Sequence, residues 1–373
     1  MKKAVTILYL LSNMVYSFAQ EPFTVEALYK GDFGTNHLGG FKQGSVYMGL
    51  MDLGIHFNTE QAGLWKGGEV YIQIQNTHGG NLSGSFIGDL QVASNIENAP
   101  YTYLYMAWYK QEIGKLMLLG GIHDFNSEFS FSDLSGVFLN SSFGIMPNIS
   151  LNVPVSIFPK NALGLMLHYS ITDKLHFQSA IYDGDPGTLD DLSGNTVHRL
   201  NKDEGALIIG EMHYLDDYFM VKTGFYFHTS SFQSFSDPVK HYKGNEGVYF
   251  LADYHLNKED SEKGVGVFLQ GGVSNAKKNT VPLFIGAGVN YGQLLFKNKL
   301  DVLSLAFGNA SLSNFLIDDN VFSASNEAIV ELNYLLPITD GIFLQPDVQY
   351  IINPGANGQK NALVSILRFT LEW

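Results

Sequence analysis

The segment Glu-Val-Tyr-Ile-Gln-Ile-Gln, residues 69–75, alternates strictly between polar and apolar side chains. Its valine and isoleucines fall on one face of an extended chain, and its glutamate, tyrosine and glutamines fall on the other. The same period of two recurs in residues 221–228, 301–308, 327–334 and 342–350. These segments predict β-strands with one apolar face and one polar, charged or small-residue face.

The segment Leu363–Trp373 alternates in the same way and stops on an aromatic residue. We expect it to be a final strand that pairs with the first strand, because an open sheet edge in lipid would leave backbone groups without hydrogen bonds. The aromatic run Tyr101, Tyr103, Tyr105, Trp108 and Tyr109 resembles part of an interfacial girdle. An aromatic core cluster in a soluble sheet is the alternative.

The N-terminus has the layout of a secretory signal peptide. Lys2 and Lys3 precede an apolar run, and Ser17-Phe18-Ala19 is a small-x-small cleavage site. We therefore expect a signal peptide in residues 1–19 and a single barrel domain in residues 20–373. Beyond this segment no stretch is long and apolar enough for a membrane helix, so a membrane-spanning chain would have to cross as strands.

Length and composition agree with a large transmembrane antiparallel β-barrel of the bacterial outer-membrane type. At roughly 20–22 residues per strand and turn, the mature chain has room for 16 to 18 strands, and we expect 16. The chain is rich in Gly, Phe and Tyr, with 39, 27 and 20 of them. A formal net charge of −14 excludes a basic nucleic-acid footprint and favours acidic loops or an acidic pore. With no Cys and no paired histidines at ligand spacing, we expect neither a metal nor a cofactor.

Several longer sequence motifs occur in a fixed order along the chain. They are His78-Gly79-Gly80-Asn81-Leu82-Ser83, Phe86-Ile87-Gly88-Asp89-Leu90-Gln91, Phe125-Asn126-Ser127-Glu128-Phe129, Phe138-Leu139-Asn140-Ser141-Ser142-Phe143-Gly144, Tyr182-Asp183-Gly184-Asp185-Pro186-Gly187 and Gln345-Pro346-Asp347-Val348-Gln349-Tyr350. On the basis of these motifs, the chain from about Gly44 to Trp373 resembles the carbohydrate-selective porin family, the OprB type.

That resemblance implies a 16-stranded barrel in the outer membrane of a Gram-negative bacterium. It also implies a narrow polar constriction that passes glucose and other neutral sugars by facilitated diffusion. Two features depart from the family. Where members of the family carry a longer N-terminal motif, this chain has only Gly31-Asp32-Phe33-Gly34. The arginines of the family's constriction have just two possible counterparts here, Arg199 and Arg368.

The candidate pore residues are polar residues within these sequence motifs. Sugar passage needs weak, repeated hydrogen-bonding positions rather than a nucleophile. A structural role is the alternative, because such side chains also hold loops through bonds to the backbone. The candidates are Asp89, Gln91, Asp124, Asn126, Glu128, Asp183 and Asp185, together with Gln345, Asp347 and Gln349, whose parity places them on the inner face of a strand.

Other functions stay open at this point. A general, weakly cation-selective diffusion porin is favoured by the acidic charge and the shortage of arginine. An outer-membrane hydrolase would need a serine, a histidine and an acidic residue in register. Asn140-Ser141-Ser142 offers serines without such spacing, so we expect no enzyme. The expected partners are small neutral carbohydrates and outer-membrane lipid, and both a monomer and a homo-oligomer are compatible with the sequence.

Overall fold

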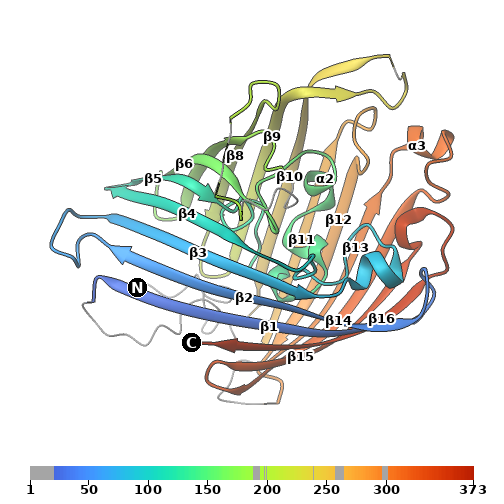
Figure 1. Cartoon of the computed structure of the whole chain (residues 1–373), viewed down its shortest axis with the longest axis horizontal. Coiled ribbons are helices and arrows are strands. Elements are labelled where there is room, and N and C mark those ends of the chain that lie inside the picture. The colour runs from blue at the N-terminus through green and yellow to red at the C-terminus, as the bar shows by residue number, and fades with distance from the viewer. Residues whose placement is uncertain are drawn as a thin grey trace.

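The computed structural model is a closed barrel of 16 antiparallel strands (Figure 1). The structure describes residues 21–187, 194–196, 198, 200–237, 239–256, 264–295 and 301–373. Each strand pairs with its chain neighbours, and β1 pairs with β16 to close the barrel. The expected fold class and strand number are confirmed. The strands are β1 (Phe23–Leu38), β2 (Gly44–Asn58), β3 (Gly68–Gly79), β4 (Tyr101–Ile113), β5 (Leu116–His123), β6 (Ala162–Ser170), β7 (Leu175–Asp183), β8 (Ala206–Leu215), β9 (Phe219–Gln233), β10 (His241–His255), β11 (Gly264–Ser274), β12 (Leu283–Gly292), β13 (Val302–Ser311), β14 (Asn326–Thr339), β15 (Ile342–Ile352) and β16 (Ala362–Glu372).

The alternation of polar and apolar residues in the sequence corresponds to alternating inward and outward side chains in the barrel wall. On β3, Ile72 and Ile74 are 43% and 46% exposed, whereas Gln73 and Gln75 are 7% and 3% exposed. The apolar parity therefore faces outward, toward lipid, and the polar parity faces the lumen. The closing seam is continuous, because the backbones of Ala27 and Trp373 exchange hydrogen bonds of 3.1 and 2.9 Å. The expected signal peptide lies outside the described residues.

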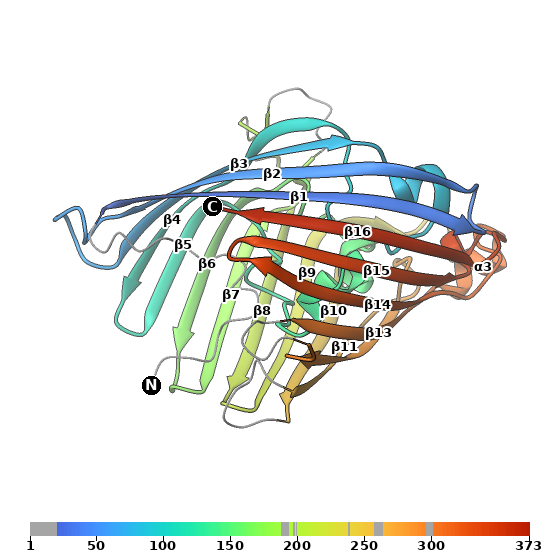
Figure 2. The same ribbon diagram turned by 90° about the horizontal axis from the view of Figure 1, so that it is seen from below.

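The two ends of the barrel differ. One end carries short turns, such as the one between β14 and β15, and the C-terminus lies there (Figure 2). The opposite end carries the long connections and the short helix α3 (Asn314–Asp318). In outer-membrane barrels short turns face the periplasm and long connections face outward, which orients this chain.

Strand β4 contains a bulge that changes the parity of its side chains. Leu104 pairs with Ile74 and Met106 pairs with Gln73, so Tyr105 is an extra residue in the ladder. One inserted residue turns the rest of the strand to the other face. Tyr103 before the bulge and Trp108 after it consequently both belong to the lumen side, as the register of β3 against β4 requires.

The predicted aromatic girdle is therefore wrong for most of the run. Tyr103 and Tyr105 are 2% and 7% exposed, and Trp108 packs on the ring of Tyr71, which also faces inward. Tyr109 does face outward; it is 38% exposed, and its hydroxyl accepts a hydrogen bond of 2.9 Å from Nε1 of Trp65. The run is an inner aromatic surface with a single outward ring at its end.

Two long connections fold into the lumen. The first joins β3 to β4 and contains the π-helical turn η1 (Ser83–Ile87). The second joins β5 to β6 and contains η2 (Ser135–Val137), α1 (Ser141–Gly144) and α2 (Pro147–Ser150). Figure 1 shows α2 inside the ring of strands. Fully buried rings such as Phe125, Phe129 and Phe143 give these connections an apolar core inside the barrel.

The polar segments 184–203 and 230–245 are predicted from the sequence as extracellular loops or a pore constriction, and the first lies between β7 and β8. Residues 230–233 and 241–245 form the ends of β9 and β10, so the connection between these two strands is shorter than predicted. Much of residues 184–203 lies outside the described residues, although Gly194 accepts a backbone bond of 2.8 Å from Leu104. Within the described chain, no helix combines the length and apolarity needed to cross a membrane.

Candidate functional site: a cavity in the barrel lumen

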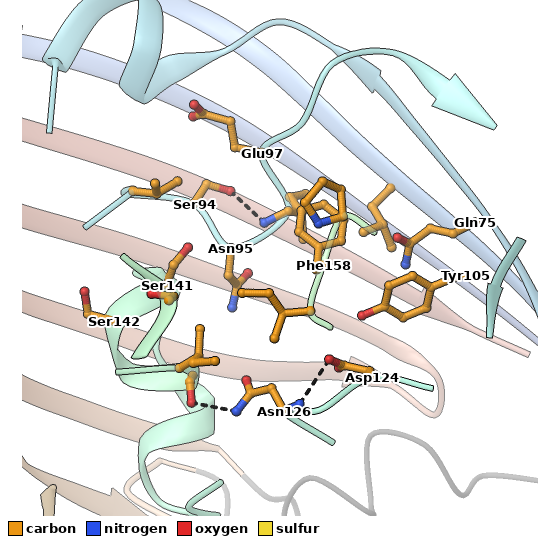
Figure 3. Close-up of a pocket in the computed structure, with 18 of the residues that line it drawn as sticks. Gln75, Ser94, Asn95, Glu97, Tyr105, Asp124, Asn126, Ser141, Ser142 and Phe158 are labelled. Carbon is orange, nitrogen blue, oxygen red and sulfur yellow. Dashed lines mark hydrogen bonds between the residues drawn. The ribbon is translucent and has the colours of Figure 1, made fainter. Parts of the chain in front are cut away.

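A cavity of about 500 Å³ lies in the lumen. Strands β1–β4 form one side of it, and the two inward connections form the other (Figure 3). In Figure 3, Gln75 and Tyr105 from the strands face Asn95, Asp124 and Asn126 from the connections. Amide, hydroxyl and carboxyl groups thus meet across a space that a small polar solute could occupy.

The strand side of the cavity presents ordered polar groups. Lys30, Asp52, Gln73 and Gln75 line it from three neighbouring strands. Nε2 of Gln75 donates to Oδ1 of Asp52 at 2.8 Å, and the hydroxyl of Tyr103 donates to Oε1 of Gln75. Because Gln75 is held by two neighbours, its amide keeps a fixed orientation at the cavity.

The connection side carries carboxyl groups in turns. Oδ1 of Asp124 accepts from the backbone N–H of Asn126 at 3.0 Å, and Nδ2 of Asn126 donates to the carbonyl of Gly144 at 3.1 Å. Glu97 accepts from the backbone amides of Leu82 and Ser83 at 2.8 and 2.9 Å, and so caps η1.

Burial changes the protonation of these two carboxyl groups. Burial raises the pKa of Asp124 to about 6, even though its turn hydrogen bonds oppose the shift. Burial likewise raises the pKa of Glu97 to about 7. The cavity therefore becomes more negative as the pH rises from about 5 to 8.

Some of the candidate pore residues predicted from the sequence motifs reach this cavity. Gln91, Asp124 and Asn126 line it. Asp89 lies next to this segment and close to Glu327; burial and the negative charge of Glu327 raise the pKa of Asp89.

The other candidate pore residues from these motifs lie outside the cavity lining. Glu128, Asp183 and Asp185 are not among the described residues that line the cavity. Burial raises the pKa of Glu128 to about 7. Asp183 ends β7 with the outward parity of Ile181, and exposed Asp185 accepts from the backbone N–H of Gly187 at 2.7 Å.

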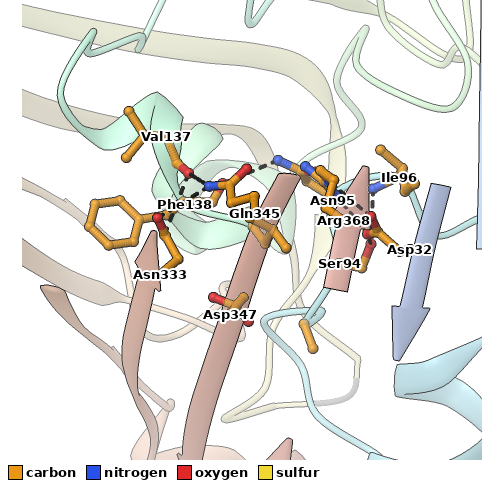
Figure 4. Close-up of polar contacts among 12 residues, drawn as sticks. Asp32, Ser94, Asn95, Ile96, Val137, Phe138, Asn333, Gln345, Asp347 and Arg368 are labelled. Atoms are coloured by element: carbon orange, nitrogen blue, oxygen red, sulfur yellow. Dashed lines mark hydrogen bonds and ion pairs between the residues drawn. The ribbon is translucent and has the colours of Figure 1, made fainter. Parts of the chain in front are cut away.

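The predicted residues of β15 do face inward, but the second connection and the first cover them. Nε2 of Gln345 donates to the carbonyl of Val137 at 2.6 Å (Figure 4). Nε2 of Gln349 donates to the carbonyl of Ala93 at 2.8 Å. Asp347 is 2% exposed and accepts from Nε2 of Gln349 at 3.0 Å. Of the described residues that line the cavity, none belongs to β15. The parity prediction is thus confirmed, and the observed contacts hold loops.

Carboxylates on the same side of the barrel bind the connections through backbone amides. Glu327 accepts from the N–H groups of Leu90 at 2.9 Å, Gln91 at 2.9 Å and Gly355 at 2.6 Å. Glu331 accepts from those of Leu139 at 2.6 Å and Asn140 at 3.1 Å.

Two further anchors repeat the pattern on β8 and β10. Glu211 accepts from the N–H of Ser130 at 2.9 Å, and Asp253 accepts from the hydroxyl of Ser132 at 2.6 Å. Bonds of this kind hold the two inward connections against the strands.

The comparison with protein families decides what kind of barrel this is. Residues 42–373 match the family model described as "Carbohydrate-selective porin, OprB family". The chain belongs to this OprB family. Porin B of Pseudomonas aeruginosa is 23% identical over 395 residues, which cover 90% of this chain and 84% of that protein.

Solved structures agree on the barrel fold of this OprB-family chain. The high-pH structure of Pseudomonas putida OprB matches with a TM-score of 0.87 and 20% identity, covering 94% of both chains. The outer membrane channel DcaP of Acinetobacter baumannii matches with a TM-score of 0.60 and 11% identity, covering 94% of this chain and 97% of that one. The OprB family and the porin fold are those of channels in the outer membrane.

The arginine pattern of this OprB-family member is resolved in part. Arg368 is buried on β16 and binds Asp32 of β1 through two hydrogen bonds of 2.8 Å each. Ser94 of the first connection donates to the same carboxylate at 2.7 Å (Figure 4). Arg199 lies outside the described residues. Lys30 is therefore the basic side chain among the described residues that line the cavity.

Sequence reasoning missed Lys30, Asp52, Gln73 and Tyr105 as lining residues. Gln73 was placed on the polar parity of its strand, and extending the same parity to β1 and β2 would have added Lys30 and Asp52. Tyr105 was hidden by the bulge, which no period-two pattern reveals. Among the described residues, no group of three His, Asp or Glu side chains could hold a metal ion.

Proposed function

We propose that this OprB-family porin conducts neutral monosaccharides such as glucose by facilitated diffusion. The observation that supports the proposal is the cavity between the bare wall of β1–β4 and the two inward connections. Its amides, hydroxyls and carboxyls can exchange hydrogen bonds with sugar hydroxyls one after another, while no single position holds the solute tightly. Gln91, Asp124 and Asn126 are the predicted pathway residues that this proposal keeps at the cavity.

The experiment is liposome swelling with the refolded full-length protein. Glucose, a disaccharide, arginine and gluconate are compared at equal osmolarity. Faster entry of glucose than of ions of similar size supports the proposal. Entry ranked by size and charge alone contradicts it.

A general, weakly cation-selective porin is the second candidate. The observation that favours it is the charge of the cavity, where Asp52, Glu97 and Asp124 outnumber Lys30. Such a channel should give a cation-selective reversal potential in a KCl gradient, and glucose should not block its current.

A further inference from the structure

Three aromatic rings form a continuous strip on the lumen face of β2, β3 and β4. The ring centroids of His56 and Tyr71 are 4.2 Å apart, and those of Tyr71 and Trp108 are 5.2 Å apart. The strip lies on the short-turn side of the cavity. Tyr71 is two residues from the cavity-lining Gln73 on the same face of β3, which corresponds to about 7 Å along the strand.

Charged groups surround the strip. His56 lies 2.8 Å from Glu69 through Nδ1 and 3.5 Å from Glu26 through Nε2. Nζ of Lys110 is 2.5 Å from Oε2 of Glu69, and the hydroxyl of Tyr71 donates to Oε1 of Glu26 at 2.7 Å. Acidic and basic side chains thus alternate across the four strands, in the order Glu26, His56, Glu69 and Lys110.

The central ring of the strip, Tyr71, is 6% exposed, whereas His56 and Trp108 on either side are partly exposed. The side chains of Glu26, His56, Glu69 and Lys110 remain 22–31% exposed. Gly54 leaves the room for the bond between Tyr71 and Glu26, because a Cβ at this position would lie 2.7 Å from each of the two bonded oxygens. The polar atoms are thus both fixed in place and accessible from the lumen.

We propose that this strip is a second subsite, which takes a neutral saccharide as it leaves the cavity toward the short-turn end. The inference rests on the proposed function. A pyranose ring has apolar C–H groups on its faces, which suit the electron-rich faces of aromatic rings. Its hydroxyl groups suit fixed, charged donors and acceptors, which make stronger hydrogen bonds than neutral ones. A chain of weak sites keeps the solute moving.

The test is a binding measurement that does not depend on transport. The chain has three tryptophans, and the double variant Trp65→Phe/Trp373→Phe leaves Trp108 as the reporter. The full-length refolded variant is titrated with glucose while tryptophan emission is recorded. A saturable change in emission is the expected result. The double variant Trp108→Phe/Trp373→Phe, which leaves Trp65 as the reporter, should give no change.

Substitutions in the wild-type chain then locate the site by the glucose concentration that half-blocks the ion current. Trp108→Ala should raise it about five- to tenfold, because one aromatic contact is lost. Trp108→Phe should restore most of the block, and Glu69→Gln should weaken it without removing a ring. Tyr109→Ala is the matched control, because this neighbouring ring faces outward and should leave the block unchanged. Migration of unheated samples in SDS gels shows whether each variant is folded.

The outcomes separate the subsite from the proposed function. If wild-type liposomes prefer glucose and Trp108→Ala behaves like Tyr109→Ala, with no emission change at Trp108, the subsite is overturned and the function stands. If wild-type liposomes show no preference for glucose and the emission at Trp108 is constant, both are overturned. A folded Glu69→Gln variant that weakens the block supports the subsite even where Trp108→Ala does not fold.

Discussion

The two sides of the lumen are built from the same kind of alternating strand, but their inward polar side chains have different contacts. On β13–β16 the inward polar side chains are covered, and Glu327, Glu331, Gln345 and Gln349 hold the inward connections. On β1–β4, by contrast, Lys30, Asp52, Gln73 and Gln75 line the cavity, and we call this part of the barrel the uncovered wall. Inward parity therefore shows which side chains face the lumen, and the folded connections decide which of them a solute can meet.

The largest effect should come from breaking the buried pair between β1 and β16. Arg368→Met leaves the carboxylate of Asp32, which is 0% exposed, without its partner. An uncompensated buried charge costs about 3–5 kcal/mol, so the free energy of unfolding should fall by that amount. Urea unfolding of the barrel in micelles or vesicles measures it.

The uncovered wall supplies the control for this experiment. Lys30→Met should lower the free energy of unfolding by less than Arg368→Met does, since Lys30 is partly exposed whereas Arg368 is 5% exposed. Equal losses for Arg368→Met and Lys30→Met would show that the two sides do not differ in the way described.

A smaller effect is expected from releasing one anchor of the first inward connection. Glu327→Ala removes the acceptor for the backbone amides of Leu90, Gln91 and Gly355. The loss of these charge-assisted bonds should cost about 2 kcal/mol of stability and free the first connection. Single-channel recording should show larger and noisier conductance. Unchanged conductance in Glu327→Ala, with Glu60→Ala on an exposed turn as the control, would contradict an anchoring role.

On the uncovered wall a substitution should change selectivity rather than conductance noise. Lys30→Met removes a positive charge from the cavity lining. At about 10 Å and an effective dielectric constant of about 20, one charge contributes about 1–2 kcal/mol to the energy of a passing ion. The permeability ratio of cations to anions should rise several-fold, as the reversal potential in a KCl gradient reports. Lys115→Met, on a short turn, should leave the ratio as it is.

The smallest effect should be the dependence of selectivity on pH. Burial raises the pKa values of Asp124 and Glu97 to about 6 and about 7, so both are largely neutral at pH 5 and largely charged at pH 8. Cation preference should therefore increase over this range. Asp124→Asn should remove the part of the change centred near pH 6. A preference that is constant from pH 5 to 8 would show that these groups do not face the permeating ions.

The period-two pattern predicted the strands and the face of most strand residues, and the chain length predicted the strand number. Gln73 and Ile72 lie on the predicted faces because lipid and lumen impose opposite chemistry on neighbouring positions. The same pattern could not separate Gln345, which binds a loop, from Gln75, which lines the cavity. That difference depends on how the distant connections fold inside the barrel. The part that Gln91, Asp124 and Asn126 play in passage stays a prediction.

The bulge in β4 is as decisive for that strand as its composition. If Tyr105 were paired in the ladder instead of bulged, the alternation from Tyr103 onward would turn the remainder of the strand inside out. Trp108 and Lys110 would then meet lipid, where a lysine costs up to about 4 kcal/mol at the midplane and less near the surface, and Tyr109 would meet water. The bulge thus decides which solvent half of the strand meets, and deleting Tyr105 itself, which keeps Leu104 opposite Ile74 and Met106 opposite Gln73, should be tolerated.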